Sequence, residues 1–288
     1  MTTSLGVSTI RSFATKWLGE VDIGIERSRG CSRVIRRQHR GPLCVQRAFY
    51  PEGDGTAHLY LVHPPGGLVQ GDRLNVRLHA GEGASAVVTT PAAAKLYRAP
   101  TGATWQDVRL SVEQGASLEW LPLETIVFSG ARAQTRLCAD ISAHGRLVAW
   151  DVVCFGRPAS DEPFDEGVFD SVIELVVDGE LRWIERTRIP GYGDDRLGQA
   201  RWGLGGHCVM GTLMAVGPVG ISGDTMQMVR DYFEAPGCGG VTDVDGALVV
   251  RVLGDSAWRV RDKLCTVWEV LRPWLLGKLP VWPRIWAT

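Results

Sequence analysis

The sequence predicts a mainly β protein built from stacked β-sheets of β-helix-like or solenoid character, with a few helices toward the C-terminus. Short runs of alternating apolar and polar residues fill most of the first 220 residues, which is typical of strands with one buried face. The 35 Gly and 15 Pro residues are spread between these runs, as the turns of a many-stranded fold would be. A strand–turn–strand unit also recurs with a period near 30 residues.

The repeat is defined by the glycines that follow the alternating runs. Gly83, Gly115, Gly145 and Gly179 are 32, 30 and 34 residues apart, with a strand-like run before and after each. Units of this kind bury their apolar faces by stacking on their neighbours. The pattern alone leaves one alternative open, which is regular strand spacing that arises by chance in a β-rich chain.

The strands of the first 220 residues follow in chain order from the alternation. The clearest of them span residues 17–26, 58–62, 73–80, 107–113, 135–143 and 171–179. No linker or low-complexity segment divides the chain. The sequence therefore predicts a single domain over 1–288, β-rich over 1–220 and mixed α/β over 221–288.

Beyond about residue 220 the pattern changes to helices and one further strand. A helix is predicted over 222–234, where Ser222 or Asp224 suits the N-cap, and a strand over 244–254 includes an Asp-Gly turn. A second helix is predicted over 255–278, which Pro273 should kink or end. Four apolar residues lie on one face of this second helix: Leu264, Val267, Trp268 and Leu271.

The composition is that of a soluble globular protein and excludes several function classes. The 288 residues carry a net charge of −1, whereas nucleic-acid binders have a marked basic excess. No apolar run approaches the length of a membrane span, and the N-terminus lacks the apolar stretch of a secretory signal. Seven Cys without a C-x-x-C pair argue against a closed zinc site and for a reducing compartment. A cytoplasmic location is therefore expected.

The block "HPPGGLVQGD", residues 63–72, is the first candidate site. His63 could act as a metal ligand or a base, and Asp72 as a ligand or a turn-former. The block is not a phosphate-binding loop, because no Lys-Ser or Lys-Thr and no helix follow it. The alternative reading is a rigid turn that holds a buried, hydrogen-bonded histidine.

Two acids in apolar, Trp-bearing strands form the second candidate site. Asp151 and Glu185 each lie six residues beyond a repeat glycine, so in-register stacking would place them on neighbouring rungs of one face. Such a carboxylate must be paired, hydrated in a passage or bound to a cation. The alternative is an ion pair with a nearby arginine: Arg157, Arg186 or Arg188.

Other polar clusters are weaker signals. The pair His207–Cys208 is interpreted as structural, since adjacent residues of a strand point to opposite faces. Residues 26–41 carry six Arg, which suit a solvated strand face or a docking patch for an acidic partner. No nucleophile motif such as G-x-S-x-G or H-E-x-x-H is present.

Five segments together resemble the urease accessory protein family UreD, called UreH in some bacteria. They cover nearly the whole chain in the right order, namely residues 40–52, 58–72, 89–99, 118–131 and 283–288. The H-P-P-G-G-x-V-x-G-D and Pro-x-Glu-Thr-Ile blocks are specific to that family. The chain departs from it at Asp161–Glu162, where the family usually has Gly-Glu, and at Leu123, where Gln is common.

The resemblance implies a scaffold with no reaction of its own. Members bind UreF and through it the GTPase UreG, dock on apo-urease, and deliver nickel; dimerisation of the accessory complex is compatible with this role. No tightly bound cofactor is implied, only transient Ni²⁺ in a water-filled passage. The expected partner surface combines the apolar face of the second helix, Leu264, Val267, Trp268 and Leu271, with Arg284 and Trp286 of the tail.

The resemblance also assigns candidates for the passage. Asp72 matches the last residue of the H-P-P-G-G block and Glu185 the acid of a Glu-Arg motif, while Asp151 and His63 are added from the residue pattern. Carboxylates suit a passage because imidazole and especially thiolate would retain Ni²⁺. Two alternatives stay open, a metal-dependent enzyme that uses His63, Asp72 and Glu185, and a structural adaptor that never touches metal.

Overall fold

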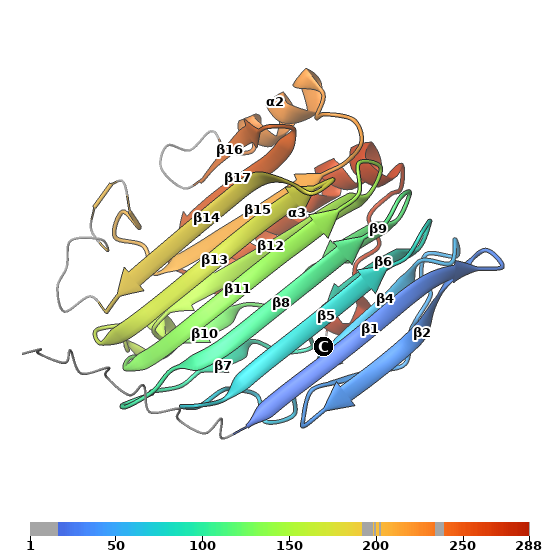
Figure 1. The fold of residues 1–288 in the computed structure, drawn as a ribbon. Coiled ribbons are helices and arrows are strands. Elements are labelled where there is room, and N and C mark those ends of the chain that lie inside the picture. The colour runs from blue at the N-terminus through green and yellow to red at the C-terminus, as the bar shows by residue number, and fades with distance from the viewer. Residues whose placement is uncertain (1–16, 192–197, 199, 202, 234–238, 288) are drawn as a thin grey trace, which may run out of the picture.

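Two β-sheets face each other, and one long helix covers the outer side of the second sheet (Figure 1). The computed structural model describes residues 17–191, 198, 200–201, 203–233 and 239–287. The predicted class is confirmed, since strands stacked in solenoid-like coils make up about half of the described chain, and a long helix lies near its C-terminus. Within these residues no helix combines the length and the apolar character needed to cross a membrane.

The front sheet has seven strands in the order β14-β13-β11-β8-β5-β1-β2. Its centre is parallel and in register, because β1, β5, β8, β11 and β13 all run in one direction. Its two edge strands, β2 and β14, are antiparallel to their neighbours. The strands span Leu18–Ser28 (β1), Cys31–Arg40 (β2), Arg73–Ala80 (β5), Thr104–Val112 (β8), Ala131–Ile141 (β11), Gly167–Val177 (β13) and Glu180–Pro190 (β14).

The back sheet has ten strands, eight of them in the order β16-β17-β15-β12-β9-β6-β4-β3. The short strands β7 and β10 pair with each other, and β10 also pairs with β12. The strands span Cys44–Val45 (β3), Ala57–Val62 (β4), Ser85–Thr89 (β6), Ala94–Leu96 (β7), Ser117–Trp120 (β9), Thr125–Val127 (β10), Arg146–Phe155 (β12), Val209–Val216 (β15), Gly239–Val244 (β16) and Ala247–Gly254 (β17).

The glycine repeat corresponds to crossings between the sheets, but only three times. The chain passes from front to back at the turns that contain Gly83, Gly115 and Gly145. At the fourth position Asp178 and Gly179 both have positive φ, 51° and 77°, as in the tight turns that join hairpin strands. The chain therefore returns within the front sheet as β14 instead of crossing.

This hairpin corrects the predicted placement of the two strand acids. Asp151 lies on β12 of the back sheet, whereas Glu185 lies on β14 of the front sheet. They are therefore not neighbouring rungs of one sheet. Both strands still turn these side chains toward the space between the sheets, because Asp151 alternates with buried Ala149 and Val153, and Glu185 pairs with buried Ile173.

The space between the sheets is filled by two apolar clusters. The larger lies toward the strand ends that carry Leu78, Leu110 and Ile141, and the smaller one surrounds Phe155 and Phe169. A third cluster lies behind the back sheet, where the helix α3, Ala257–Leu276, packs on β12, β15 and β17. The shorter helix α2, Gly223–Asp231, contacts α3 and β16.

The two helices agree with the predicted positions except at their ends. Ser222 and Ser256 are the N-caps, and each side chain accepts a hydrogen bond from a backbone N–H of the first turn. The first predicted helix reached residue 234, which lies outside the described residues. Pro273 does not end α3, since the helix runs on to Leu276 and closes with Gly277 in the left-handed conformation, its N–H donating to the Pro273 carbonyl.

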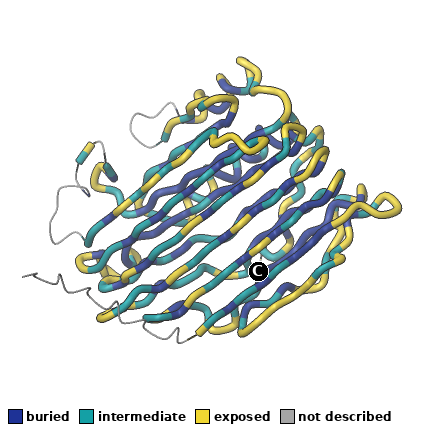
Figure 2. The backbone as a smooth tube through the Cα atoms, viewed as in Figure 1, coloured by how far each residue is buried: buried dark blue, intermediate teal, exposed yellow. Residues whose placement is uncertain are grey.

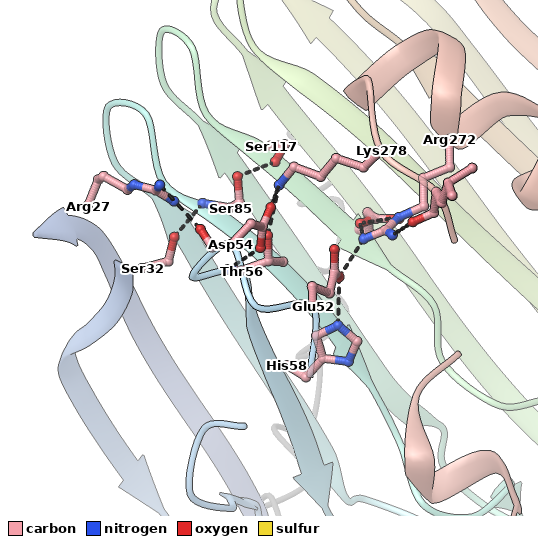
Figure 3. A network of polar contacts seen from close by, with 12 residues as sticks. Arg27, Ser32, Glu52, Asp54, Thr56, His58, Ser85, Ser117, Arg272 and Lys278 are labelled. Carbon is pink, nitrogen blue, oxygen red and sulfur yellow. Dashed lines mark hydrogen bonds and ion pairs between the residues drawn. The ribbon is translucent and has the colours of Figure 1, made fainter. Parts of the chain in front are cut away.

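A buried ion network fastens α3 to the back sheet (Figure 3). The Arg272 guanidinium has no exposed surface, and its Nη2 lies 3.0 Å from Oε1 of Glu119 on β9. Glu52 binds the same guanidinium and also His58, at 2.8 Å. The Trp268 Nε1 donates to Glu119 over 2.6 Å. The network thus joins the start of β4 to the end of α3.

Loss of the Arg272 cation should destabilise the fold strongly. Arg272→Met leaves two buried carboxylates, Glu52 and Glu119, without their cation, and such a change costs about 3–5 kcal/mol. Arg261→Met on the same helix is the matched control, because its pair with Glu124 is partly exposed and worth about 1 kcal/mol or less. Urea denaturation of both variants measures the difference, and equal losses would contradict the role of the buried network.

Candidate functional site

A cavity of about 330 Å³ lies between the sheets. Its outer end is formed by the loop from His63 to Gly67 and by residues 90–95, and it reaches the surface where Pro64 and Ala92 are exposed. On the side away from this loop it is lined by Asp151 of β12 and by Phe169 and Ile173 of β13, which we call its inner end. The cavity therefore connects the surface at one end of the sheets with the space between the two apolar clusters.

The front sheet lines this cavity with a row of uncharged polar side chains. Gln106, Thr135 and Ser171 are in register on β8, β11 and β13, and all three line the cavity. Thr187 on β14 continues the row. Parallel, in-register pairing therefore turns one polar position per strand into a continuous polar strip.

Two atoms of this row are buried without a hydrogen-bond partner among the described residues. They are the Gln106 Oε1 and the Thr135 Oγ1. A buried polar atom without a partner costs about 1–3 kcal/mol, so native proteins supply a partner or a water. Most of the cavity lining is apolar, but the cavity has room for a water beside these polar side chains, which could supply the missing hydrogen bonds.

Asp151 faces this row from the back sheet. It is in register with Thr212 on β15, which is in turn in register with Arg251 on β17. Asp151 lies deep in the protein yet keeps some accessible surface, because it borders the cavity. It forms no ion pair within the described part of the chain, in contrast to most other interior acids.

Burial sets the charge of Asp151. Burial raises the pKa of the Asp151 carboxyl to about 6, and the negative charge of Glu185 acts in the same direction. The Arg251 charge and a hydrogen bond from the Val152 N–H lower this pKa, but they do not outweigh burial. Asp151 is therefore ionised at neutral pH at a cost in folding free energy, and its pKa is close enough to 7 for a nearby cation to shift its protonation.

Glu185 is neutralised by an arginine from the opposite sheet. Its carboxylate forms an ion pair with Arg251 of β17 and accepts a hydrogen bond from the Thr187 Oγ1 at 3.2 Å. The predicted arginine pairing is thus found, but with a different partner. Arg186 and Arg188 lie on the opposite face of β14 from Glu185, and Arg157 follows β12 and pairs with Glu162. Glu185 does not border the cavity.

The H-P-P-G-G block builds the mouth of the cavity. Its backbone pairs with β7 and the residue that follows it, since the Leu68 N–H donates to the Lys95 carbonyl at 2.7 Å and the Tyr97 N–H to the Leu68 carbonyl at 2.9 Å. Only glycine fits at position 67, where a Cβ atom would lie 2.4 Å from the Tyr97 ring. The glycines thus serve close backbone packing beside the mouth.

The two titratable residues of the block have different roles. His63 borders the mouth, and burial lowers the pKa of its imidazole against the opposing charge of Asp72, which keeps the ring neutral at pH 7. Asp72 is 3% exposed and does not border the cavity. Its Oδ2 accepts a hydrogen bond from the Val69 N–H at 2.9 Å. This contact agrees with the prediction that Asp72 is a turn-former.

The structure therefore brings two of the four predicted metal residues to one cavity, His63 at the mouth and Asp151 at the inner end. In the described ranges no three His, Cys, Asp or Glu side chains are close enough to hold a metal ion together. Sequence reasoning missed Gln106, Thr135 and Ser171. Their signal was a polar residue at an inward position of an otherwise apolar alternation.

The residues predicted to bind a partner lie mostly inside the protein. Leu264, Val267, Trp268 and Leu271 are at most 1% exposed, because they pack against the back sheet. This corrects the prediction, since a side chain without accessible surface contacts its own core and not a partner. Trp286 is half-buried, stacks on Trp150 with a ring-centroid distance of 5.7 Å, and donates to the Thr89 Oγ1 at 2.9 Å. Arg284 is exposed.

Comparison with known proteins identifies one family along nearly the whole described chain. The family model described as "UreD urease accessory protein" matches residues 18–287. The chain belongs to the UreD family. This UreD family member is 43% identical over 277 residues to urease accessory protein UreD 2 of Pseudomonas syringae pv. tomato, which covers 96% of this chain and 97% of that protein.

Other UreD proteins match over a similar extent. The urease accessory protein UreD of Pseudomonas aeruginosa is 42% identical over 278 residues, covering 96% of this chain and 97% of its own length. That of Chromohalobacter salexigens is 40% identical over 292 aligned positions, covering 94% of this chain and 89% of its own. The resemblance to the UreD family seen in the sequence is thereby confirmed.

The raised pKa of Asp151 predicts a pH-dependent stability difference between the native protein and its Asp151→Asn variant. A rise from 3.8 to about 6 makes the folded state bind more protons than the unfolded state between these values, so the stability of the native protein falls as pH rises from 4 to 6. Above pH 6 the cost of the charge is complete, on the order of 3 kcal/mol.

The variant should therefore be more stable than the native protein at pH 7.5 by about 1–3 kcal/mol and no more stable at pH 4. Urea denaturation across this pH range measures the difference. A stability gain that is constant with pH would show that Asp151 is not a buried, unpaired acid.

Proposed function

We propose that this protein is a non-catalytic scaffold for nickel insertion into apo-urease, and that Ni²⁺ crosses it through the cavity between the sheets. It binds UreF and through it UreG, in the cytoplasm. The observation that supports a passage is the polar strip of Gln106, Thr135 and Ser171, which faces the carboxylate of Asp151, unpaired among the described residues. Hydration of the orphaned Gln106 and Thr135 oxygens would give the ion a wet path.

The donor set of the cavity suits transit more than storage. Hydroxyl and amide oxygens bind divalent ions weakly, and imidazole and thiolate ligands bind Ni²⁺ more strongly. One histidine at the mouth and one aspartate at the inner end provide attraction without a closed coordination shell. The ion would therefore keep most of its water and leave as readily as it enters.

The charges around Asp151 favour passage in a further way. Glu185 adds negative charge near it, while Arg251 neutralises that charge in part. An isolated pair of carboxylates would hold a divalent cation more firmly than one carboxylate beside an ion pair. We propose that the Glu185–Arg251 pair limits the affinity of the inner end, and that Asp72 holds the mouth in shape.

The apolar face of α3 packs against the back sheet and is not available to a partner. We therefore propose that UreF binds to exposed residues around α3. Trp258, Leu279 and Trp282 are exposed at 62%, 78% and 46%. Arg284 lies in the same C-terminal segment. Large exposed apolar side chains next to an arginine are typical of interface anchors.

Two rival functions lead to different expectations. A metal-dependent enzyme built on His63, Asp72 and Glu185 needs these groups together, but Asp72 closes a turn and Glu185 pairs with Arg251. A purely structural adaptor needs the partner surface and not the cavity. The nickel experiment must therefore distinguish the nickel passage from a purely structural adaptor.

The passage predicts that changes inside the cavity lower nickel delivery without dissociating the complex. Asp151→Asn removes the carboxylate at the inner end, and Thr135→Val removes an orphaned hydroxyl at nearly constant volume. Each is expected to lower nickel per urease active site several-fold when it is co-expressed with urease, UreF and UreG. Metal analysis of purified urease measures nickel, and co-purification measures the complex.

The matched control is Glu124→Gln, because Glu124 pairs with Arg261 at 3.0 Å on the other side of the back sheet, away from the cavity. It should leave nickel content unchanged. Normal nickel content in both cavity variants would favour the adaptor. Loss of UreF together with loss of nickel would assign these residues to assembly.

Removal of the exposed apolar side chains tests the proposed UreF surface. Trp258→Ser with Leu279→Ser should weaken co-purification of UreF, because both side chains are exposed and neither belongs to the buried clusters. Val219→Ser is the control, since Val219 is 70% exposed on the β15–α2 loop. Undiminished UreF binding by the double variant would place the partner surface elsewhere.

A further inference from the structure

The apolar walls of the cavity are the part that a metal passage does not use. Buried positions alternate with exposed or intermediate ones along the strands of the front sheet (Figure 2), so each strand directs every second side chain into the protein. The inward row next to the polar strip is in register across four strands, β5, β8, β11 and β13. It lines the cavity with Val76, Val108, Leu137 and Ile173. A hydrated metal ion binds oxygen, nitrogen or sulfur ligands and gains nothing from such a row.

The back sheet closes the cavity with further apolar side chains. Leu61 of β4, Trp120 of β9 and Val153 of β12 line it and are at most 5% exposed. The front row spans three gaps between neighbouring strands, about 14 Å. The cavity volume of about 330 Å³ is roughly twice the ~150 Å³ of an engineered apolar cavity that holds benzene. The cavity therefore has room for a small, elongated apolar molecule.

A single carboxylate lies among these walls. Asp151 is the one acid of the cavity lining within the described ranges. Arg251, whose charge acts on Asp151, forms its ion pair with Glu185 instead. An ionised carboxylate in apolar surroundings is costly unless a cation accompanies it. The inner end of the cavity therefore lacks a positive charge.

The basic residues of the lining do not supply this charge. Arg136 points to the outer face of the front sheet, where its Nη2 lies 2.7 Å from Oε2 of Glu174. Lys95 and His63 belong to the outer end of the cavity, and the His63 ring is neutral at pH 7 because burial lowers its pKa. A cation that fits the inner end therefore has to come from outside the chain.

The polar strip supplies hydrogen-bond acceptors that face this carboxylate. The Gln106 Oε1 and the Thr135 Oγ1 are in register on neighbouring strands, and both are buried without a partner among the described residues. A primary ammonium group has three N–H donors and no acceptor. It can therefore donate both to the Asp151 carboxylate and to oxygens of the strip, while an alkyl chain attached to it contacts the apolar rows.

We propose that the cavity is a binding site for small primary alkylamines. The amine is held as its ammonium ion, with the nitrogen at Asp151 and the alkyl chain along Val108, Leu137 and Ile173. Mostly apolar walls with a few polar groups that orient the ligand are typical of small-molecule sites. The binding itself is independent of the proposed function. Its consequence, that a bound amine blocks the path of a metal ion, rests on the proposed function.

A series of three ligands tests the match between ligand and cavity. Isothermal titration calorimetry of the purified full-length protein at pH 7.5 compares hexylamine with butylamine and 1-hexanol. Both amines are protonated at this pH, since alkylammonium groups have pKa values of about 10.4. Hexylamine should bind about tenfold more tightly than butylamine, because two more methylene groups leave water. It should bind at least about tenfold more tightly than 1-hexanol, because the alcohol forms no ion pair with Asp151.

The Asp151→Asn variant removes the charge at nearly constant shape. It should bind hexylamine about tenfold or more weakly than the native protein does, and 1-hexanol with an affinity within about twofold of the native value. The matched control is Glu124→Gln, because Glu124 pairs with Arg261 at 3.0 Å, away from the cavity. This control should bind hexylamine like the native protein. Thermal unfolding of both variants without ligand verifies the fold.

Several results would overturn the proposal. Equal binding of hexylamine and butylamine would show that the apolar walls do not hold the chain. Undiminished hexylamine binding by Asp151→Asn, or equal binding of hexylamine and 1-hexanol, would show that the nitrogen does not lie at Asp151. Absence of binding at millimolar hexylamine would show that the cavity takes no amine. The assay contains neither urease nor nickel, so a failure of the nickel passage leaves its outcome unchanged.

Discussion

In-register hydrogen bonding between parallel strands is the constraint on which the rest of this structure depends. It places the same strand position of successive coils side by side. Residues of one kind at that position therefore form a row across the sheet. Apolar rows form the two clusters that hold the sheets together. A polar row between these clusters leaves a cavity instead of a continuous core. On the outer side the same register gathers arginines from separate coils.

The back sheet is stabilised differently, because a helix covers it. An arginine with no exposed surface, Arg272, joins that helix to two strand-side carboxylates, Glu52 and Glu119. Buried charges of this kind are favourable only when every partner is present. The inside of the sheet pair contains a further cross-sheet pair, Glu185 with Arg251. Buried ion pairs therefore help to fix the position of α3 on the back sheet and of the back sheet on the front sheet, because, unlike apolar packing, they require specific partners.

The sequence predicted the fold class, the C-terminal helix and the position of its apolar face from periodicity, because alternation and helical spacing are local properties. Glycine spacing predicted three crossings correctly and failed at Asp178–Gly179. A crossing turn and a hairpin turn share the same residue types, and only backbone geometry separates them. The family was predicted from the specific blocks, and the family comparison confirms it.

The cavity was predicted only in part. Asp151 was found because an acid in an apolar strand is conspicuous. Gln106, Thr135 and Ser171 were missed because they lie at different distances from their turn glycines, so an alignment on those glycines does not superimpose them. Asp72 and Glu185 were predicted as passage residues. Asp72 instead accepts a hydrogen bond from the backbone of Val69, and Glu185 forms an ion pair with Arg251. An apolar helix face was assigned to a partner because a sequence does not distinguish a partner from the chain's own sheet.

The antiparallel strands that flank the front sheet also determine where the solenoid stops. The hairpin at Asp178–Gly179 folds β14 back on β13, and β2 folds back on β1 in the same way. Each of these terminal strands is rich in arginine, and β14 ends at a proline, features that discourage another chain from extending a sheet. A stack of parallel coils would otherwise offer two open ends for polymerisation, so the reversal of direction acts as a cap that keeps this protein a particle of finite size.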